Sequence, residues 1–362
     1  MAISNDLPDI NEIEVSLFGP GVGEAICVHI GNGKWIIVDS CINPISNNPA
    51  SLEYLHSIGV NTVNDVVLVI VSHWHDDHVN GISKIVSECT NAFVVFPDAM
   101  LGKDFLTLTS LQNLPEHIEK SGVSEISKVV SLIAERISLN KHDIKSYPIQ
   151  ARADLRLFQH DKVEIWALSP STAAIFQSKI EIGKLLKTNE LRRKLVPMSE
   201  NLNAIAIFIV TEHGNVLLGA DLETHSSLTQ ITGWQAVVDS KNKPTAKASI
   251  FKIPHHGSIN GHHPEVWSDM LDADPLSIMT AYSRSKLPKS TDISRIKALS
   301  GHLYQTTINS PKLPVRDKVI ESFLKNITKS RIVKTNRLGH IQTRMKHGKC
   351  TTKLNDSAIT LK

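Results

Sequence analysis

Three histidines and two aspartates stand within six consecutive residues, His73-Trp74-His75-Asp76-Asp77-His78. They directly follow the apolar run of residues 66–71, which predicts a buried strand, so the cluster lies on a loop with a rigid base. Imidazole and carboxylate groups together bind borderline divalent metals such as zinc and manganese. A solvated surface turn is the alternative interpretation, but such turns favour Gly, Asn, Ser and Pro. The cluster therefore predicts a metal site.

This pattern resembles the signature of the metallo-β-lactamase fold superfamily, a strand followed by His-x-His-x-Asp-His. The resemblance implies an α/β metallo-hydrolase with a four-layer αββα sandwich. It also implies two divalent metal ions, zinc or manganese. His73 and His75 would bind metal 1, whereas Asp77 and His78 would bind metal 2. Asp76 occupies the variable position and receives no role.

Three later strand ends resemble the remaining motifs of that family. Residues 33–40 resemble the opening strand that ends in Asp39, which would accept a hydrogen bond from a ligand imidazole. Residues 216–221 resemble the strand that ends in Gly-Asp, so Asp221 would bridge both metals, although Ala220 is inserted. Residues 249–258 supply the last ligand, His256, on metal 2.

The sequence Pro254-His255-His256-Gly257-Ser258 resembles one branch of the superfamily, which contains the nuclease domain of the DNA-uptake protein ComEC and the bacterial phosphorylcholine esterases. By that resemblance His255 faces the scissile phosphate. The two histidines could exchange roles, because neighbouring side chains on an extended segment point to opposite faces. Asp77, as a base that holds the attacking water, and His255 are the candidate catalytic residues. Candidate substrate-binding residues are Asn203, Lys252, Arg284 and Lys286.

One ligand that the lactamases and glyoxalases provide is missing. The stretch of residues 197–205, where a further metal-1 histidine would stand, contains none. Glu200, Asn201 or Asn203 must substitute, or metal 1 has fewer protein ligands. Oxygen in place of nitrogen shifts the preference from zinc towards manganese or magnesium. The alternatives His142, His160 and His213 are more typical of surface histidines.

The motifs come from both halves of the chain and must converge in one hydrolase domain, residues 1–305. Alternation and apolar runs predict strands over 14–18, 25–29, 35–38, 66–72, 93–96, 163–167, 205–210, 216–219, 250–253 and 277–280, with helices near 51–58 and after Gly81. A helical insertion covers about 102–150, where Ile126, Val129, Val130, Ile133 and Ile137 form an ordinary packing face. A lid or a partner surface is the alternative interpretation of this insertion.

Residues 306–362 are predicted to form a basic C-terminal extension. The last 51 residues hold 13 Lys and Arg against 3 Asp and Glu, a balance of +10, so the first 311 residues carry −7 of the whole-chain charge of +3. Such a surface attracts polyanions, although basic segments are often only solvated. Residues 331–333 and 339–344 alternate like a hairpin, and the segment is poor in aromatic residues for stacking on bases.

Composition sets the outer limits of the interpretation. The chain has 362 residues, 41% of them apolar, which is enough for an ample core. Its four cysteines show no Cys-x-x-Cys spacing and predict reduced thiols in a cytoplasmic protein. The amino terminus lacks the features of a signal peptide, and no stretch approaches the roughly 20 apolar residues of a membrane helix. We therefore expect no contact with a membrane.

Two metals about 3.5–4 Å apart would make hydroxide available and neutralise a phosphate under attack. We therefore expect a phosphodiesterase, with nucleic acid as the first choice of substrate and an effector role in bacterial antiviral defence as its context. The alternative is a hydrolase of a small molecule, either a cyclic nucleotide or a lactone. A third interpretation is a subunit switched by a protein partner on the helical insertion or the basic extension.

Overall fold

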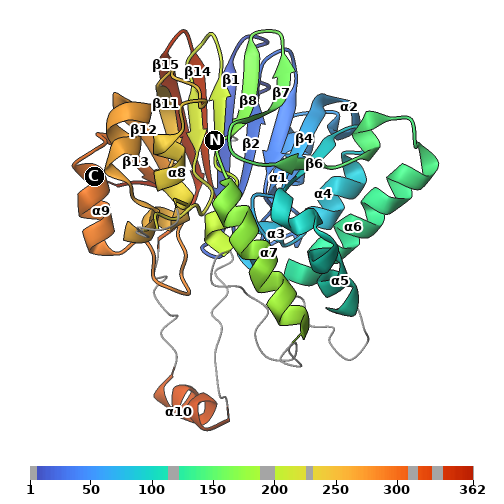
Figure 1. Ribbon diagram of the computed structural model, residues 1–362. Helices are drawn as coiled ribbons and strands as arrows, with labels where there is room; N and C mark the ends of the chain where they lie inside the picture. Colours follow the sequence, from blue (N-terminus) through green and yellow to red (C-terminus); the bar gives the residue numbers. More distant parts are fainter. Residues whose placement is uncertain are drawn as a thin grey trace.

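The computed structural model describes residues 6–112, 122–187, 200–225, 231–308, 317–327 and 337–361. Over these residues the chain forms two eight-stranded sheets, which stand in the middle of the molecule (Figure 1). In spatial order the first sheet contains β15 (Lys349–Asp356), β14 (Gly339–Lys346), β1 (Ile13–Gly19), β2 (Ala25–His29), β3 (Trp35–Val38), β4 (Val66–Ile70), β5 (Phe93–Pro97) and β6 (Ile149–Ala151). The second contains β16 (Ile359–Thr360), β13 (His302–Gln305), β12 (Leu271–Met279), β11 (Ala248–Lys252), β10 (Val216–Leu218), β9 (Ile207–Val210), β8 (Val163–Ala167) and β7 (Leu155–His160).

Helices cover the outer face of each sheet. Helices α1 (Ala50–Ser57), α4 (Ile82–Glu88), α5 (Lys103–Gln112) and α6 (Gly122–Leu139) share an apolar cluster with the first sheet, whereas α8 (Gly233–Asp239) and α9 (Ser290–Lys297) share one with the second. A third cluster lies between the two sheets. The other α-helices are α2 (Thr62–Asp65), α3 (Asp76–Val79), α7 (Thr172–Lys187) and α10 (Lys318–Ile327). The predicted four-layer αββα sandwich is confirmed.

The strand β3 shows how the sequence produces these layers. Successive side chains of a strand point to opposite faces of the sheet. Ile36 and Val38 belong to the cluster between the sheets, whereas Trp35 and Ile37 belong to the cluster under the helices. Because both faces are buried, the strand is apolar throughout instead of alternating with polar residues.

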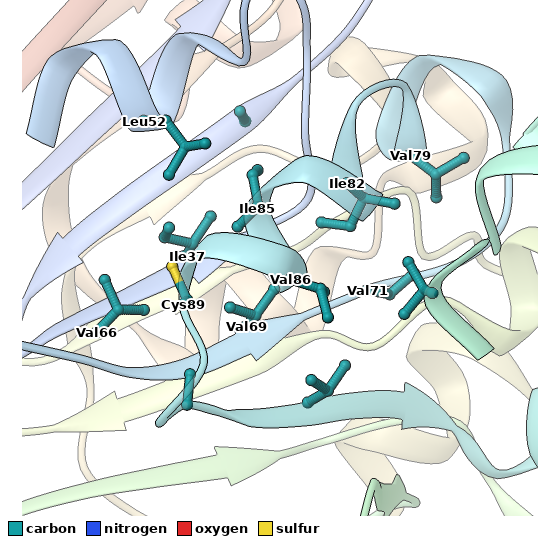
Figure 2. Packing of buried hydrophobic residues seen from close by; sticks show 14 of the residues in the cluster. Ile37, Leu52, Val66, Val69, Val71, Val79, Ile82, Ile85, Val86 and Cys89 are labelled. Carbon is teal, nitrogen blue, oxygen red and sulfur yellow. The ribbon is translucent and has the colours of Figure 1, made fainter. Parts of the chain in front are cut away.

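Figure 2 shows the helix-side cluster in detail. Ile82, Ile85 and Val86 of α4 lie over Ile37 of β3 and Val69 of β4, and all five side chains are fully buried. Burying an aliphatic side chain of this size contributes about 1.5–3 kcal/mol relative to leaving it exposed. This packing holds β4 in place, and the histidine cluster of the sequence begins shortly after that strand.

The parallel parts of the two sheets direct the ligand-bearing strand ends to one edge. In the first sheet β3, β4 and β5 run parallel, and in the second sheet β10, β11, β12 and β13 do the same. Parallel strands have their carboxyl ends at the same edge of the sheet, where loops carry functional residues. The segments after β3, β4, β10 and β11 are therefore brought within reach of each other.

The predicted boundary at residue 305 does not separate two units. β14 pairs with β1 along its whole length, from Ile13 opposite Met345 to Gly19 opposite Gly339. β16 pairs with β13, so the predicted extension contributes strands to both sheets. The hairpin partner of β14 is β15, joined through the turn at His347 and Gly348, whose φ angles of 49° and 73° are those of a type I′ turn. Residues 331–333, the predicted partner, lie outside the described residues.

Two basic side chains of the predicted extension form ion pairs with acidic residues near the start of the chain. Arg344 Nε donates to Glu14 Oε2 at 2.9 Å, and Lys346 Nζ lies 2.8 Å from Asp9 Oδ2. Arg344 is therefore paired with a carboxylate of β1, and Lys346 with the exposed Asp9 before it, whereas polyanion binding by this segment stays a prediction. Within the described ranges, no helix is long and apolar enough to cross a membrane.

The helical insertion packs as predicted. Ile126, Val129 and Ile133 of α6 are buried in the helix-side cluster of the first sheet, with Val130 and Ile137 partly buried against it. The packing interpretation of this apolar face is confirmed.

Candidate metal centre

Four side chains from both sheets converge on one buried point. Asp77 and His78 lie on α3, which follows β4, whereas Asp221 follows β10 and His256 follows β11. His78 Nε2 lies 3.4 Å from Asp221 Oδ1 and 3.7 Å from Asp77 Oδ2. His256 Nε2 lies 3.4 Å from Asp77 Oδ2 and 3.4 Å from Asp221 Oδ2. These are the four residues predicted to bind metal 2.

The spacing of these atoms fits a divalent ion. Ligands at about 2.0–2.2 Å from a tetrahedral ion lie about 3.3–3.6 Å from each other, close to the measured separations. Two of the buried atoms, His78 Nε2 and Asp221 Oδ1, have no hydrogen-bond partner among the described residues. Buried polar atoms are normally paired, so an orphaned nitrogen facing an orphaned carboxylate oxygen indicates a place for a cation.

The electrostatics of the cluster favour positive charge at the same point. Burial opposes the charged form of His78, but Asp221, Asp77 and Asp39 outweigh it and hold its pKa well above the ordinary value. Burial also opposes the charged form of His256, yet Asp221 and Asp77 raise its pKa to about 9. The paired carboxylates attract either a proton or a metal ion.

Asp39 orients two of the histidines. Its Oδ2 lies 2.7 Å from His78 Nδ1 and accepts a hydrogen bond from Ser72 Oγ at 2.6 Å. Because the Ser72 hydroxyl has donated its proton, it can only accept from His73 Nδ1, which is 2.9 Å away. Assigned from this network, the neutral form of each imidazole carries its proton on Nδ1 and presents a lone pair on Nε2. Asp39 thus lies where the sequence predicted a carboxylate that accepts a hydrogen bond from a ligand imidazole.

The metal-1 side gathers fewer ligands. His73 Nε2 lies 3.0 Å from His75 Nδ1, so the two predicted metal-1 histidines are together. Among the described His, Cys, Asp and Glu side chains, His73 forms a ligand group with Asp39 and His78, but no group unites it with His75 and a third ligand. Residues 197–199 of the stretch in question lie outside the described residues. The number of metals, their identity and the preference for manganese stay predictions.

The backbone is in a rarely used conformation at several of these positions. Asp39, Ala220, His255 and His256 have φ angles of 60°, 43°, 48° and 51°. A non-glycine residue in the left-handed region costs about 1–3 kcal/mol and is concentrated at functional sites. The two histidines therefore do not lie on an extended segment, as the sequence suggested, but on a tight turn that sends them in different directions.

The structure separates the roles of these neighbouring histidines. His256 reaches Asp77 and Asp221, whereas His255 Nδ1 lies 3.0 Å from Glu223 Oε1. Asn201 Nδ2 donates to the same Glu223 oxygen at 2.9 Å. His255 thus stays outside the ligand cluster, with a carboxylate beside one ring nitrogen. Only its position two residues after Asp221 distinguishes Glu223 in the sequence.

Two of the predicted substrate-binding residues are buried. The Lys252 side chain is fully buried and its Nζ lies 2.5 Å from Glu24 Oε1 and 3.9 Å from Asp221 Oδ1. This position behind Asp221 does not fit direct contact with a substrate, because the ammonium group is already enclosed by protein acceptors. Asn203 is 5% exposed and ends the short 3-10 helix Glu200–Asn203.

The other two predicted substrate-binding residues lie on the surface after β12. Arg284 and Lys286 are both exposed. Arg284 hydrogen-bonds Tyr282, whose ring stacks on His256 with centroids 5.0 Å apart and planes 15° apart. The guanidinium group is therefore linked to the ligand cluster through one aromatic ring. No such link is seen for Lys286.

Asp76, the variable residue of the motif, joins the ligand loop to the helical insertion. Its Oδ1 accepts from Gly122 N–H at 2.5 Å, at the start of α6. The ring of Trp74 lies 4.5 Å from that of Phe105 on α5. A carboxylate at a helix N-terminus satisfies an amide that the helix itself leaves unpaired. The insertion therefore supports the loop that carries the first four predicted ligands.

No family model matches the sequence, and no curated protein matches it. Among solved structures, the chain is similar to a HARLDQ-motif mutant of a metallo-β-lactamase from Cronobacter sakazakii, with 12% identity, a TM-score of 0.33 and coverage of 66% of this chain and 75% of that one. The chain is also similar to the metallo-β-lactamase fold protein YhfI from Bacillus subtilis, with 13% identity, a TM-score of 0.33 and coverage of 67% of this chain and 70% of that one. The Rm3 metallo-β-lactamase shows 13% identity and a TM-score of 0.33, with coverage of 80% of this chain and 84% of that one.

Because these identities and TM-scores are low, the fold is assigned from the molecule itself. Two packed sheets, helices on both outer faces and metal-type side chains after β4, β10 and β11 form the predicted arrangement. The protein has the four-layer sandwich of the metallo-β-lactamase fold. The narrower resemblance to the branch with the ComEC nuclease domain stays a prediction.

Proposed function

We propose that the protein is a metal-dependent phosphodiesterase that acts on polynucleotides in the cytoplasm. The observation that carries the proposal is the buried group of Asp77, His78, Asp221 and His256, whose ligand atoms are spaced for a divalent ion. A divalent ion held by these four residues would act as a Lewis acid. It would polarise a phosphoryl oxygen and make hydroxide available near neutral pH.

Residues around the cluster supply the remaining parts of such a reaction. His255, placed against Glu223, can deliver a proton to the departing oxygen through its other ring nitrogen. Arg284 is exposed and interacts with Tyr282, and a guanidinium group there can hold a phosphate with two parallel hydrogen bonds. The combination of a paired acid–base histidine and an exposed guanidinium beside the cluster favours a phosphodiester over a lactone, which carries no negative charge.

The test is a substrate panel on the purified full-length protein, stripped of metal and reloaded separately with manganese, zinc, nickel or magnesium. The substrates are single- and double-stranded DNA and RNA, a cyclic dinucleotide, bis(p-nitrophenyl) phosphate and a lactone. We expect cleavage of polynucleotides in the wild type and none in Asp77→Ala. His142→Ala, a change at an exposed histidine outside the ligand groups, is the matched control.

Hydrolysis of only the lactone or the cyclic dinucleotide would replace this proposal with the small-molecule alternative. Turnover that appears only after a cellular protein is added would favour the partner-regulated subunit. The predicted role as an effector in bacterial defence depends on the same chemistry, so Asp77→Ala should also lose any protection against phage.

A further inference from the structure

The buried ion pair of Lys252 and Glu24 has no place in the proposed reaction. Glu24 is 1% exposed and lies in the loop between β1 and β2, whereas Lys252 ends β11 in the other sheet. Besides its 2.5 Å contact with Glu24, Lys252 Nζ donates to Ala220 O at 2.8 Å. Burying two charges is costly, so a buried pair points to a purpose other than stability alone.

The second oxygen of Glu24 leads to a metal ligand. Thr280 Oγ1 donates to Glu24 Oε2 at 2.6 Å, and the same hydroxyl oxygen lies 2.8 Å from His256 Nδ1. The Glu24 carboxylate, whose other oxygen faces the Lys252 ammonium group, is the acceptor in this hydrogen bond from Thr280. The Thr280 hydroxyl must therefore give its proton to Glu24 and accept from His256. This leaves the proton of the neutral imidazole on Nδ1 and the lone pair on Nε2, which faces Asp77 and Asp221.

The backbone of Glu24 reaches a further ligand. Its amide N–H donates to the carbonyl oxygen of Asp77 at 2.9 Å. One residue thus contacts the ligand loop of the first sheet through its main chain and the ligand His256 of the second sheet through Thr280. Asp39 serves His78 by a direct contact, but His256 is served through an intervening hydroxyl.

We propose that Glu24, acting through Thr280, is the positioning residue that holds His256 in its metal-binding tautomer, and that Lys252 holds the Glu24 carboxylate in place. The proposal rests on the metal-binding part of the proposed function. Lys252 is then an internal counterion for the site and does not touch a substrate.

The hydrogen-bond chain from Glu24 through Thr280 to His256 is called the relay below. The zinc affinity of the protein, measured by competition with a chromophoric chelator, tests it. Thr280→Val removes the hydroxyl at nearly constant volume and should weaken zinc binding by about 10–100-fold, the usual cost of losing a group that orients a ligand. Thr280→Ser keeps the hydroxyl and should bind zinc nearly as the wild type does. The matched control is Thr343→Val on β14, a buried threonine whose hydroxyl oxygen lies 3.2 Å from that of Thr352 on the neighbouring strand. Wild-type affinity in Thr280→Val would overturn the relay.

The tautomer can also be read directly, which keeps the test decisive where Thr280→Val fails to fold. Nitrogen-15 NMR of the histidine rings in the zinc-loaded wild type should show His256 protonated at Nδ1 and bound to zinc at Nε2. Zinc on Nδ1 of His256 would overturn the relay but leave the hydrolase proposal standing. A wild-type protein that binds no zinc, manganese, nickel or magnesium would overturn both.

A double-variant cycle tests the part played by Lys252. Lys252→Met leaves the Glu24 carboxylate buried without its cation, so it should lower the urea midpoint of the metal-free protein. Adding Glu24→Gln removes that charge, and the double variant should recover most of the loss. Strictly additive effects of the two changes would show that the two side chains do not depend on each other, against the proposal.

Discussion

Two buried polar networks of this protein differ in whether every buried polar atom has a hydrogen-bond partner. A network in which all atoms are paired is called closed, and one with unpaired atoms is called open. In the first sheet, Glu14 is fully buried and each of its oxygens has protein donors. Oε1 accepts from Ser16 Oγ at 2.8 Å and from the Tyr54 hydroxyl, whereas Oε2 accepts from Gln342 at 3.1 Å and from Arg344 at 2.9 Å. In the cluster of Asp77, His78, Asp221 and His256, two buried atoms have no hydrogen-bond partner among the described residues.

The closed network stabilises the fold, whereas the open network is arranged to bind a cation. A closed network satisfies every buried group and adds to stability. An open one holds facing carboxylates whose charge a proton or an added metal ion can neutralise. The comparison therefore predicts that changes in the two networks will affect different measurements.

The largest expected effect is on catalysis by the open network. Asp77→Ala or His78→Ala should lower turnover of a phosphodiester by more than about 10³-fold, because the ion contributes several kcal/mol to the barrier. The metal-free Asp77→Ala variant should unfold at a urea concentration close to that of the wild type, since Asp77 belongs to the open network. Turnover and urea unfolding are measured on the same samples. Activity that survives at a few per cent, with contamination excluded, would end the metal-cluster mechanism.

A smaller loss of activity is expected beside the cluster. His255→Ala should lower the rate constant by about 10²–10⁴-fold, the usual contribution of an acid–base residue, while the bound metal content stays constant. Glu223→Gln, which keeps the shape but removes the charge beside Nδ1, should lower it less. Steady-state kinetics with metal analysis distinguishes these effects. A parallel loss of metal would make His255 a ligand instead.

In the closed network the expected effect is on stability. Glu14→Ala removes the acceptor of Tyr54 and Arg344, and should lower the free energy of unfolding by about 3 kcal/mol, as for other broken buried pairs. Zinc affinity should not change. Urea unfolding and the chelator competition described above measure the two quantities. If Glu14→Ala weakened zinc binding and left the urea midpoint unchanged, the division between the networks would fail.

The smallest effect is the pH dependence of the closed network. Burial lowers the pKa of His340 from 6.5 to about 3, and its Nε2 contacts Ser16 Oγ at 3.0 Å. The unfolded chain takes up this proton below about pH 6.5, but the folded protein only near pH 3, so stability should fall as the pH drops between these values. His340→Gln should flatten this slope in metal-free protein. His29, with its pKa lowered by burial to about 4, keeps part of the slope. Equal slopes in variant and wild type would count against the assignment to His340.

The sequence predicted the fold and the ligand cluster because both depend on local patterns. Apolar runs that end in His or Asp locate the strand ends, and parallel strands bring these ends together. The predicted substrate contact of Lys252 failed because a charged residue after an apolar run looks exposed until its partner is known. That partner, Glu24, is 228 positions away and has no periodic signal. Glu223 and Thr280 were missed for the same reason.

The pairing of β1 with β14 bears on how the protein is made. β1 is synthesised before its neighbour β14, which is encoded more than 300 residues later. Until β14 has been synthesised, β1 presents an open edge of unpaired amides and carbonyls, and Glu14 lacks Arg344. The first sheet can therefore be completed only after β14 has been synthesised, and the nascent chain must be kept from pairing that edge with another chain in the meantime.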